Sequence, residues 1–517
     1  LEAFQKGYRR NIGIVGPPFI WKSFLIQTFL KRIASTEIVP FYFSCQEFDS
    51  FERFSERWMG ELLFDFHQAF QKPLPANFRH LVRSLRPLLP KTLAHMKLVK
   101  KLVLKRRYDQ AFQELLTLTD LLHQDSGRRV LVALDEFDRL SELGLSDPFR
   151  DLGKEMMVQK DTMFVVTSSR PSRSVPIFRE KLSLLFGNFE IIELRPFNFE
   201  ESLELINQFP AGEHLQDELK RFFVRVTDGH PYYLRLVLGS LEQCSRENAS
   251  ADSTLVIQAL VKELREPSGI LGRHFQSRLY QLAQGRPWPL FADILLAISL
   301  GRKKLLEISR FAHQKTSDIK RILERLVAFE AIERHGSLFR IPDSLFRFWL
   351  STVYYWKRFP ADKSPIAGSQ SFEDEIRRAI ERSALEDAQE LPKRIEKLFR
   401  KFHNEVIQLN RKKFRCPHFI EVSSRPNNGR VFPVFARNGQ TRWLCQVVSG
   451  PVVEEDVRTF LEDAKRLRGP VHKKLILALR GIDLNAKLLA QEAKIQYLDL
   501  RDLNFLLDLY EEPKVVL

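Results

Sequence analysis

The sequence has few cysteines and no long hydrophobic run. These two features argue against a disulfide-rich or zinc-binding protein and against a protein that spans a membrane. Its four cysteines (Cys45, Cys244, Cys416 and Cys445) show no C-x-x-C spacing, so neither a zinc site nor a disulfide framework is indicated. No uninterrupted apolar run reaches the roughly 18 residues of a membrane helix. We therefore expect a cytoplasmic protein with reduced thiols and no integral membrane segment.

Acidic residues are scarcer than basic residues in this sequence. The 517 residues include 81 Lys and Arg against 65 Asp and Glu, which gives a net charge of +16. An excess of this size favours polyanions as partners, nucleic acid first and an acidic membrane surface second. A merely soluble basic protein would have the same composition. The length predicts several domains, and 44% hydrophobic residues are enough for packed cores.

A loop of the kind that binds phosphate lies between a short apolar strand and a helix predicted over residues 24–32. Gly16, Lys22 and Ser23 stand at the spacing G-x-x-x-x-G-K-[ST]. Such a loop surrounds the anion with backbone N–H groups, adds a Lys for charge and supplies a hydroxyl for Mg²⁺. Trp21 stands where the pattern has Gly. The indole therefore either points away from a nucleotide or blocks it.

A second stretch strengthens this interpretation. Residues 130–134 form an apolar run typical of a strand buried on both faces, as in a parallel sheet. Asp135 and Glu136 follow at its carboxyl end, where such sheets bind ligands. We expect Asp135 to hold Mg²⁺ through water and Glu136 to polarise an attacking water. The alternative is a buried strand that ends in a solvated acidic turn.

Further strands are predicted over residues 11–15, 37–43, 163–167 and 190–194. Strands that alternate with helices imply a parallel sheet. Ser169 and Arg170 follow one of these strands, and their polar groups can hydrogen-bond the attacking water or a γ-phosphate. Farther along, Pro231 suits the first turn of a helix, for which Asp228 is the expected N-cap.

Residues 72–107 contain eleven Lys and Arg and no acid, with leucines at helical intervals. One interpretation is a basic helical insertion that touches nucleic acid or anionic lipid. The other is a solvated helix face that its leucines pack onto the domain. The sequence favours neither.

A winged helix-turn-helix is predicted after residue 270. Helices are expected over residues 290–300, 304–313 and 316–330, followed by two short strands over 332–341. The third helix has apolar residues at spacings of 3 and 4, which leaves Lys320 and Arg321 in solvent. If this helix enters a major groove, both side chains would meet phosphates or bases.

The C-terminal part begins after a predicted linker, residues 360–370, which is rich in Pro, Ser and Gly. Beyond it we expect a helix from Phe372, a basic helix over residues 394–415, and then strands, a helix and more strands to residue 498. The basic helix would be able to contact nucleic acid.

The order of these features resembles the archaeal-ATPase branch of the STAND/AAA+ P-loop NTPases. The resemblance rests on residues 11–16, 134–137 (Leu-Asp-Glu-Phe), 194–197 (Leu-Arg-Pro-Phe) and 229–234 (Gly-His-Pro-Tyr-Tyr-Leu). It implies an α/β fold over residues 1–265, in which a P-loop NTPase parallel sheet carries a helical lid. It also implies that this domain binds ATP or ADP with Mg²⁺. The implied nucleotide contacts are Gly16, Pro17, Pro18, Lys22, Ser23, Phe24 and, over the adenine, Pro231. The implied metal ligands are Ser23 and Asp135.

This resemblance covers roughly the first 265 residues, and the order of features after them resembles the domains that follow in many of these ATPases. It implies a winged helix-turn-helix domain over residues 266–359, which in such proteins often serves only as a lid on the nucleotide domain. It implies an α/β restriction-endonuclease-like domain, with the motif PD-(D/E)-x-K, over residues 371–517. That motif needs carboxylates on adjacent strands to hold Mg²⁺, and a Lys. Gln446 and Val448 stand at the acid and Lys positions here. We therefore expect a domain without nuclease activity that serves for binding or docking.

Two functions are consistent with these features. One is an ATP-binding molecular switch, with or without weak ATPase activity. Its nucleotide state would control how the winged helix and the basic C-terminal helix contact DNA or a protein partner. The other is a pseudo-NTPase scaffold, in which Trp21 has abolished nucleotide binding and the basic parts still bind DNA. The sequence does not indicate the oligomeric state.

Overall fold

The computed structural model divides into two compact units, Leu1–Pro196 and Phe197–Leu517. The helices of residues 197–264, predicted as part of the nucleotide domain, fall in the second unit. Side chains of residues 365–371 and 412 are not described. The structure describes residues 4, 10–33, 38–46, 48, 50–69, 77–182, 189–247, 253–283, 287–359, 365–409, 412–424, 431–439, 441–467 and 469–516.

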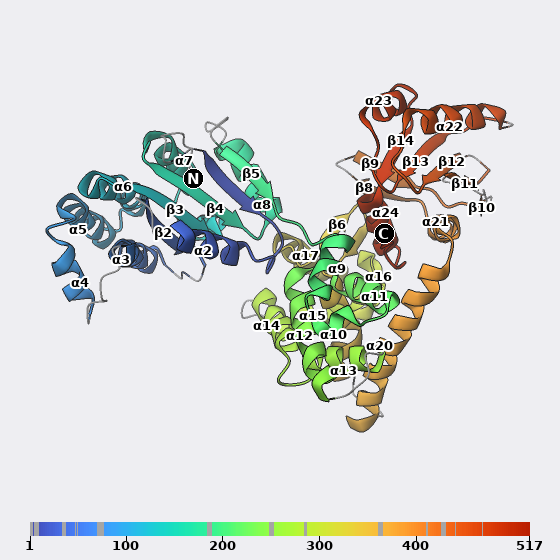
Figure 1. Ribbon diagram of the computed structural model, residues 1–517, viewed down its shortest axis with the longest axis horizontal. Helices are drawn as coiled ribbons and strands as arrows, with labels where there is room; N and C mark the ends of the chain where they lie inside the picture. Colours follow the sequence, from blue (N-terminus) through green and yellow to red (C-terminus); the bar gives the residue numbers. More distant parts are fainter. Residues whose placement is uncertain are drawn as a thin grey trace. The chain divides into compact units, whose positions relative to one another are not determined.

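The first unit is a five-stranded sheet with helices on both faces (Figure 1). Its elements are β1 (Asn11–Val15), α2 (Lys22–Ile33), β2 (Ile38–Ser44), α3 (Phe51–Ala69), α4 (Phe78–Leu85), α5 (Pro90–Leu104), α6 (Tyr108–Ser126), β3 (Arg129–Asp135), η1 (Phe137–Glu142), α7 (Pro148–Val158), β4 (Thr162–Ser168), α8 (Pro171–Pro176), η2 (Ile177–Lys181) and β5 (Phe189–Glu193).

All neighbouring strands of this sheet are parallel, in the order β2-β3-β4-β1-β5. A parallel sheet needs cover on both faces. Helix α2 supplies it on one face through Ile26 and Leu30. Helices α3, α6 and α7 supply it on the other through Phe54, Leu115 and Met156. The predicted α/β class with a parallel sheet is therefore confirmed.

The carboxyl ends of the strands lie at one edge of this sheet because all five run in the same direction. Ser44 at the end of β2 pairs with Asp135 at the end of β3, and Val15 of β1 pairs with Ser168 of β4. The loop after β1 and the acids after β3 are therefore brought to the same edge, as the sequence predicted.

The second unit begins with a bundle of helices, which is followed by a short hairpin and a second sheet. Its elements are α9 (Phe199–Asn207), α10 (Pro210–Glu213), α11 (Asp217–Thr227), α12 (Pro231–Glu247), α13 (Ser253–Leu264), α14 (Ile270–Ala283), α15 (Trp288–Ser299), α16 (Leu305–Phe311), α17 (Thr316–Ala328), β6 (Glu333–His335), β7 (Leu338–Arg340), α18 (Ser344–Trp349), η4 (Leu350–Tyr354), α19 (Tyr355–Arg358), α20 (Pro365–Ala388), α21 (Leu391–Arg400), β8 (Glu405–Leu409), β9 (Lys412–Cys416), β10 (Glu421–Ser424), β11 (Val431–Arg437), β12 (Arg442–Val448), α22 (Glu454–Arg466), β13 (Lys473–Ala478), α23 (Leu484–Glu492), β14 (Gln496–Asp499) and α24 (Leu500–Leu509).

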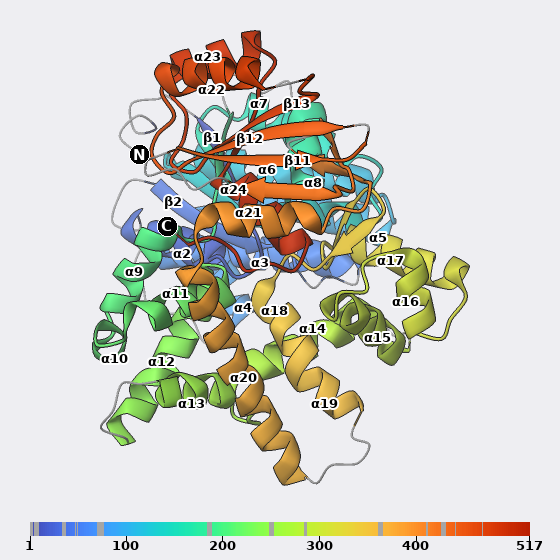
Figure 2. The same cartoon turned by 90° about the vertical axis from the view of Figure 1, so that its right-hand side faces the viewer.

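The second sheet has the order β10-β11-β12-β13-β14. Its first three strands are antiparallel neighbours, and β12, β13 and β14 are parallel. Helices α22 and α23 cover one face and α21 and α24 the other (Figure 2). Alternate residues of β12 explain this arrangement, because Leu444 packs under α22 and α23 whereas Cys445 faces the opposite core.

The hairpin β6–β7, predicted as the wing, packs against the C-terminal part of the same unit. Gly336 at its turn has φ +65°, and a Cβ there would lie 2.0 Å from the carbonyl oxygen of Val406 in β8. The ring of His335 lies edge-on to Phe505 of α24, with centroids 4.6 Å apart. Leu338 is buried in the core of the C-terminal sheet. The tip of this hairpin is therefore held by protein contacts.

A buried charge cluster adds to this contact. Asp508 of α24 accepts hydrogen bonds from the guanidinium groups of Arg340 in β7 and Arg347 in α18. Burial alone would raise the pKa of Asp508, but the two guanidinium groups outweigh burial and hold this pKa below its usual range. The carboxylate therefore stays ionised and ties α24 to the segment that contains the hairpin.

Three predictions about local structure need correction. The basic helix expected over residues 394–415 ends at Arg400, and β8 and β9 follow it. Side chains alternate between buried and exposed along β8, so strand periodicity prevails over the positive charge. Asp228 is the C-cap of α11, with φ +55°, and not the N-cap of α12. Helix α20 begins at Pro365, inside the predicted linker, because Pro is compatible with a first helical turn.

Residues 360–364 of that linker and Arg411 lie outside the described residues. The helices and strands expected over residues 290–341 are present as α15, α16, α17, β6 and β7. No helix in the described parts of the chain is long and apolar enough to cross a bilayer.

Candidate functional site

The loop between β1 and α2 forms the centre of the candidate site. Gly16 directly follows β1, and its N–H donates to the carbonyl oxygen of Ser168 at 3.2 Å. A Cβ at this position would lie 2.7 Å from the carbonyl oxygen of Leu194. Only Gly allows β1, β4 and the segment after β5 to come this close.

The loop contains two residues in the left-handed region, where Gly is usual. Phe19 has φ +60° and Trp21 has φ +64°. The backbone at position 21 therefore has the conformation that the Gly of the motif would adopt, although the residue is Trp. Such a conformation costs an L-residue roughly 1–2 kcal/mol, and strain of this kind is concentrated at functional sites.

The Trp21 indole lies beside the first turn of α2. Its ring centroid is 6.4 Å from that of Phe24, and the two planes are inclined by 56°. The Phe24 side chain itself is 65% exposed. Phe19 and Leu25 are also exposed, so the loop is surrounded by apolar side chains that face solvent.

Lys22 is the first residue of α2 and is buried. Its ammonium group donates hydrogen bonds to the carbonyl oxygens of Gly16 at 3.0 Å and Pro17 at 2.7 Å. The charge of Lys22 therefore lies inside the curve of the loop. A bound phosphate would compete with these two carbonyl groups for the ammonium group.

Asp135, the last residue of β3, meets the loop as the motif requires. Ser23 donates its hydroxyl to Asp135 Oδ2, with the two oxygens 2.7 Å apart. The Tyr42 hydroxyl donates to the same oxygen at 2.8 Å, and the Thr167 hydroxyl donates to Oδ1. Three hydroxyl groups from α2, β2 and β4 thus converge on one buried carboxylate. Hydroxyl and carboxylate oxygens are the kind of ligands that bind Mg²⁺.

Glu136 follows in a left-handed conformation, with φ +54°. Its carboxylate accepts hydrogen bonds from Ser169, through the backbone N–H at 2.9 Å and through the hydroxyl. Its own N–H donates to Thr167 Oγ1 at 3.1 Å. Ser169, predicted to bind water or phosphate, thus holds the carboxylate that was predicted to act as the base.

Arg170 has acidic partners of its own. Its guanidinium lies 3.0 Å from Glu142 and 3.4 Å from Asp138. Burial raises the pKa of Asp138 to about 6, and the Arg170 guanidinium opposes that rise only in part. Arg170 therefore neutralises a buried acid next to Glu136.

Sequence reasoning missed Tyr42, Thr167 and Asp138. Burial, and then the Asp135 carboxylate, raise the pKa of the Tyr42 hydroxyl, so it remains a donor. Each of the three lies within three residues of a strand end at the ligand edge of the sheet. A search of all strand ends for hydroxyl groups would have found Thr167. Nothing in the local sequence pairs Tyr42 with Asp135.

The remaining predicted site residues lie in the second unit. Pro231 is the first residue of α12, as predicted. Lys320 and Arg321 are exposed on α17, where they pair with Glu324 and Asp318 of the same helix. Gln446 is buried on β12 opposite Pro433 of β11. The Gln446 Oε1 atom has no hydrogen-bond partner among the described residues.

The sequence matches no protein-family model and no curated protein. Several solved structures resemble this chain. The Walker-type ATPase PABY2304 of Pyrococcus abyssi is 18% identical with a TM-score of 0.44, over 68% of this chain and 93% of that one. The Aeropyrum pernix ORC2 protein, solved as ADPNP–ADP complexes, is 13% identical with a TM-score of 0.39, over 69% and 91%. The Aeropyrum pernix ORC1 protein in complex with DNA is 13% identical with a TM-score of 0.38, over 69% and 91%. At these values the likeness establishes no family for this chain.

Proposed function

We propose that the first unit binds ATP or ADP with Mg²⁺ in the loop of residues 16–24, in the manner of a P-loop NTPase. The observation that carries the proposal is the 2.7 Å contact between Ser23 Oγ and Asp135 Oδ2. Residues 112 positions apart bring a hydroxyl and a carboxylate together beside a buried Lys. A Mg²⁺ ion bound there would neutralise phosphate charge.

Each residue has a role in this proposal. The loop N–H groups and the Lys22 ammonium bind the phosphates, once the ammonium leaves the carbonyl oxygens of Gly16 and Pro17. Ser23 and Asp135 hold the metal. Glu136, oriented by Ser169, accepts a proton from water if hydrolysis occurs.

The proposed output is a nucleotide-dependent contact with DNA or a protein partner. Lys320 and Arg321 of α17 are exposed and supply the cations of this surface. The tip of the β6–β7 hairpin packs on β8, so α17 would contact DNA without this wing. Lys413 and Arg415 on β9 take the place of the basic helix expected from the sequence. Pro231 as an adenine contact stays a prediction.

Equilibrium binding of labelled ATP to the full-length chain tests the proposal. Saturable binding at micromolar concentrations is expected for the wild type, and Lys22→Ala should abolish it. Lys31→Ala is the matched control, because Lys31 is an exposed lysine on the same helix. No binding to the wild type, or equal binding to the Lys22 variant, would contradict the proposal.

A pseudo-NTPase scaffold is the second candidate. It is favoured by Trp21 at the Gly position and by the hydrogen bonds of Lys22 to the loop itself. In that case the wild type and both Lys variants show no ATP binding, whereas duplex DNA still shifts in a gel. The shift should weaken with salt and with Lys320→Ala and Arg321→Ala.

A further inference from the structure

Helices α4 and α5, with the residues that follow to Arg107, form a surface that the proposed nucleotide site does not use. We call residues 78–107 the basic arm. It lies beyond the β2 edge of the first sheet, at the opposite end of this unit from β5 (Figure 1). Ten exposed Lys and Arg side chains belong to it, namely Arg79, Arg83, Arg86, Lys91, Lys97, Lys100, Lys101, Lys105, Arg106 and Arg107.

The arm is anchored by contacts that leave these cations outside. Thr92 donates its N–H and its hydroxyl to Asp125 of α6, both at 2.8 Å. Met96 and Val99 are buried one and two turns farther along α5. No described carboxylate lies within ion-pair distance of the ten cations. Apart from Arg106, whose charge helps to lower the pKa of Glu52, and Lys91, which donates to Gln124, these cations face solvent.

Exposed apolar side chains lie among the cations, and they distinguish a lipid surface from a nucleic acid as the partner of the arm. Leu104 is 85% exposed, and Leu98 is 41% exposed. On α5 these leucines are three residues from Lys101 on either side, so all three share one face of the helix. Phe78 and Leu88 are also exposed on the arm.

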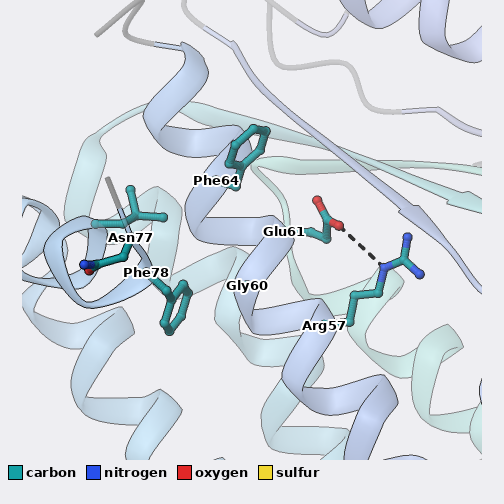
Figure 3. Close-up of a pocket in the computed structure, with 7 residues that line it drawn as sticks. Arg57, Gly60, Glu61, Phe64, Asn77 and Phe78 are labelled. Carbon is teal, nitrogen blue, oxygen red and sulfur yellow. Dashed lines mark ion pairs between the residues drawn. The ribbon is translucent and has the colours of Figure 1, made fainter. Parts of the chain in front are cut away.

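A cavity of about 530 Å³ lies between α3 and α4, at the Phe78 end of the arm (Figure 3). Phe64, Phe78 and Leu81 line it. Arg57 and Glu61 at its rim pair with each other at 3.5 Å, so the cavity has little net charge of its own.

We infer that the basic arm docks the protein on an anionic phospholipid surface. Lysines and arginines attract acidic headgroups, and exposed leucines enter the boundary between headgroups and acyl chains. A nucleic acid would use the cations, but its phosphates offer nothing to Leu98 and Leu104. The exposed rings among the described residues of the arm are those of Phe78 and His80, both at the start of α4, so α5 has no exposed ring beside Leu98 and Leu104 on which a base could stack.

Co-sedimentation of the full-length chain with vesicles tests this inference. The chain should bind vesicles that contain phosphatidylglycerol and not vesicles of phosphatidylcholine alone. Each removed lysine should lower the partition coefficient about fivefold, so combined Lys97→Gln, Lys101→Gln and Lys105→Gln should lower it by roughly 100-fold. Leu98→Ser with Leu104→Ser should lower it by about tenfold or more with the charge unchanged.

Leu484→Ser with Leu488→Ser is the matched control, because both leucines are exposed on α23 in the second unit. This control should bind as the wild type does, and circular dichroism of each variant should match the wild type. The inference is overturned by a lack of binding to the acidic vesicles, or by binding that the Leu98 and Leu104 changes leave intact. It is also overturned if DNA binding depends on the three lysines while vesicle binding does not.

Discussion

Replacement of Trp21 by Gly and, in parallel, by Ala separates the backbone strain at this position from the effect of the indole. Trp21 has φ +64°, which costs an L-residue ~1–2 kcal/mol and costs Gly little. Both variants lose the indole, but only the Ala variant keeps a Cβ. We expect the Gly variant to be about 1 kcal/mol more stable than the Ala variant. At ordinary positions Ala is the more stabilising residue.

Calorimetry of the full-length chain measures this difference. About 1 kcal/mol corresponds to roughly 2–4 °C in Tm for a unit of this size. An Ala variant that unfolds at the same temperature as the Gly variant, or above it, would refute the left-handed backbone at position 21.

The same two variants test how the indole affects a nucleotide. If the indole obstructs the phosphates, ATP should bind more tightly to Trp21→Gly than to the wild type. Weaker binding by both variants would instead mean that the indole contacts the nucleotide. Neither result depends on the stability difference, so the two readouts are independent.

Three further predictions concern contacts away from Trp21. Asp508→Asn should destabilise the second unit by about 3–5 kcal/mol at neutral pH, because two guanidinium groups lose a buried partner. The pKa of Asp508 is depressed, so its contribution is present above the unfolded value of ~4 and is lost on further acidification. Urea unfolding at several pH values should show that the stability difference between the wild type and Asp508→Asn becomes smaller as the pH falls below ~4. Gly336→Val should lower the unfolding free energy by roughly 1–3 kcal/mol, because its Cβ would lie 2.0 Å from the Val406 oxygen. Urea unfolding measures this loss, and an unchanged midpoint would contradict that packing. Tyr42→Phe should lower the unfolding free energy by about 2 kcal/mol through loss of one donor to Asp135, and calorimetry that finds no loss would exclude the bond.

The sequence predicted much of the first sheet because its strands are apolar runs bounded by polar residues. The runs over residues 130–134 and 163–167 became β3 and β4 with boundaries shifted by a residue or so. The rule that parallel strands end at one edge predicted that the loop after β1 would meet Asp135. The hydrogen bond from Tyr42 was missed because it depends on the register of β2 and β3, which places Tyr42 opposite Ala133, two residues before Asp135, and no local pattern encodes that register.

The second unit was harder to predict, for a local reason at β8 and a long-range reason at the hairpin β6–β7. The strand β8 was predicted as helix because cations follow it closely, although Ile407 and Leu409 are buried at strand spacing. The hairpin β6–β7 was predicted, but its burial was not. That burial depends on Phe505 and Asp508, which lie more than 160 residues farther along the chain.

We propose that Ser23 and Asp135 hold a metal ion against the phosphates of a nucleotide in the loop after β1. Titration of ATP into the full-length chain with and without Mg²⁺, for the wild type and for Ser23→Ala, tests this claim most directly. Mg²⁺ should tighten binding to the wild type, and the Ser23 variant should lose that gain. Binding of ATP that is equally tight without Mg²⁺, or no binding to the wild type in either condition, would contradict the claim.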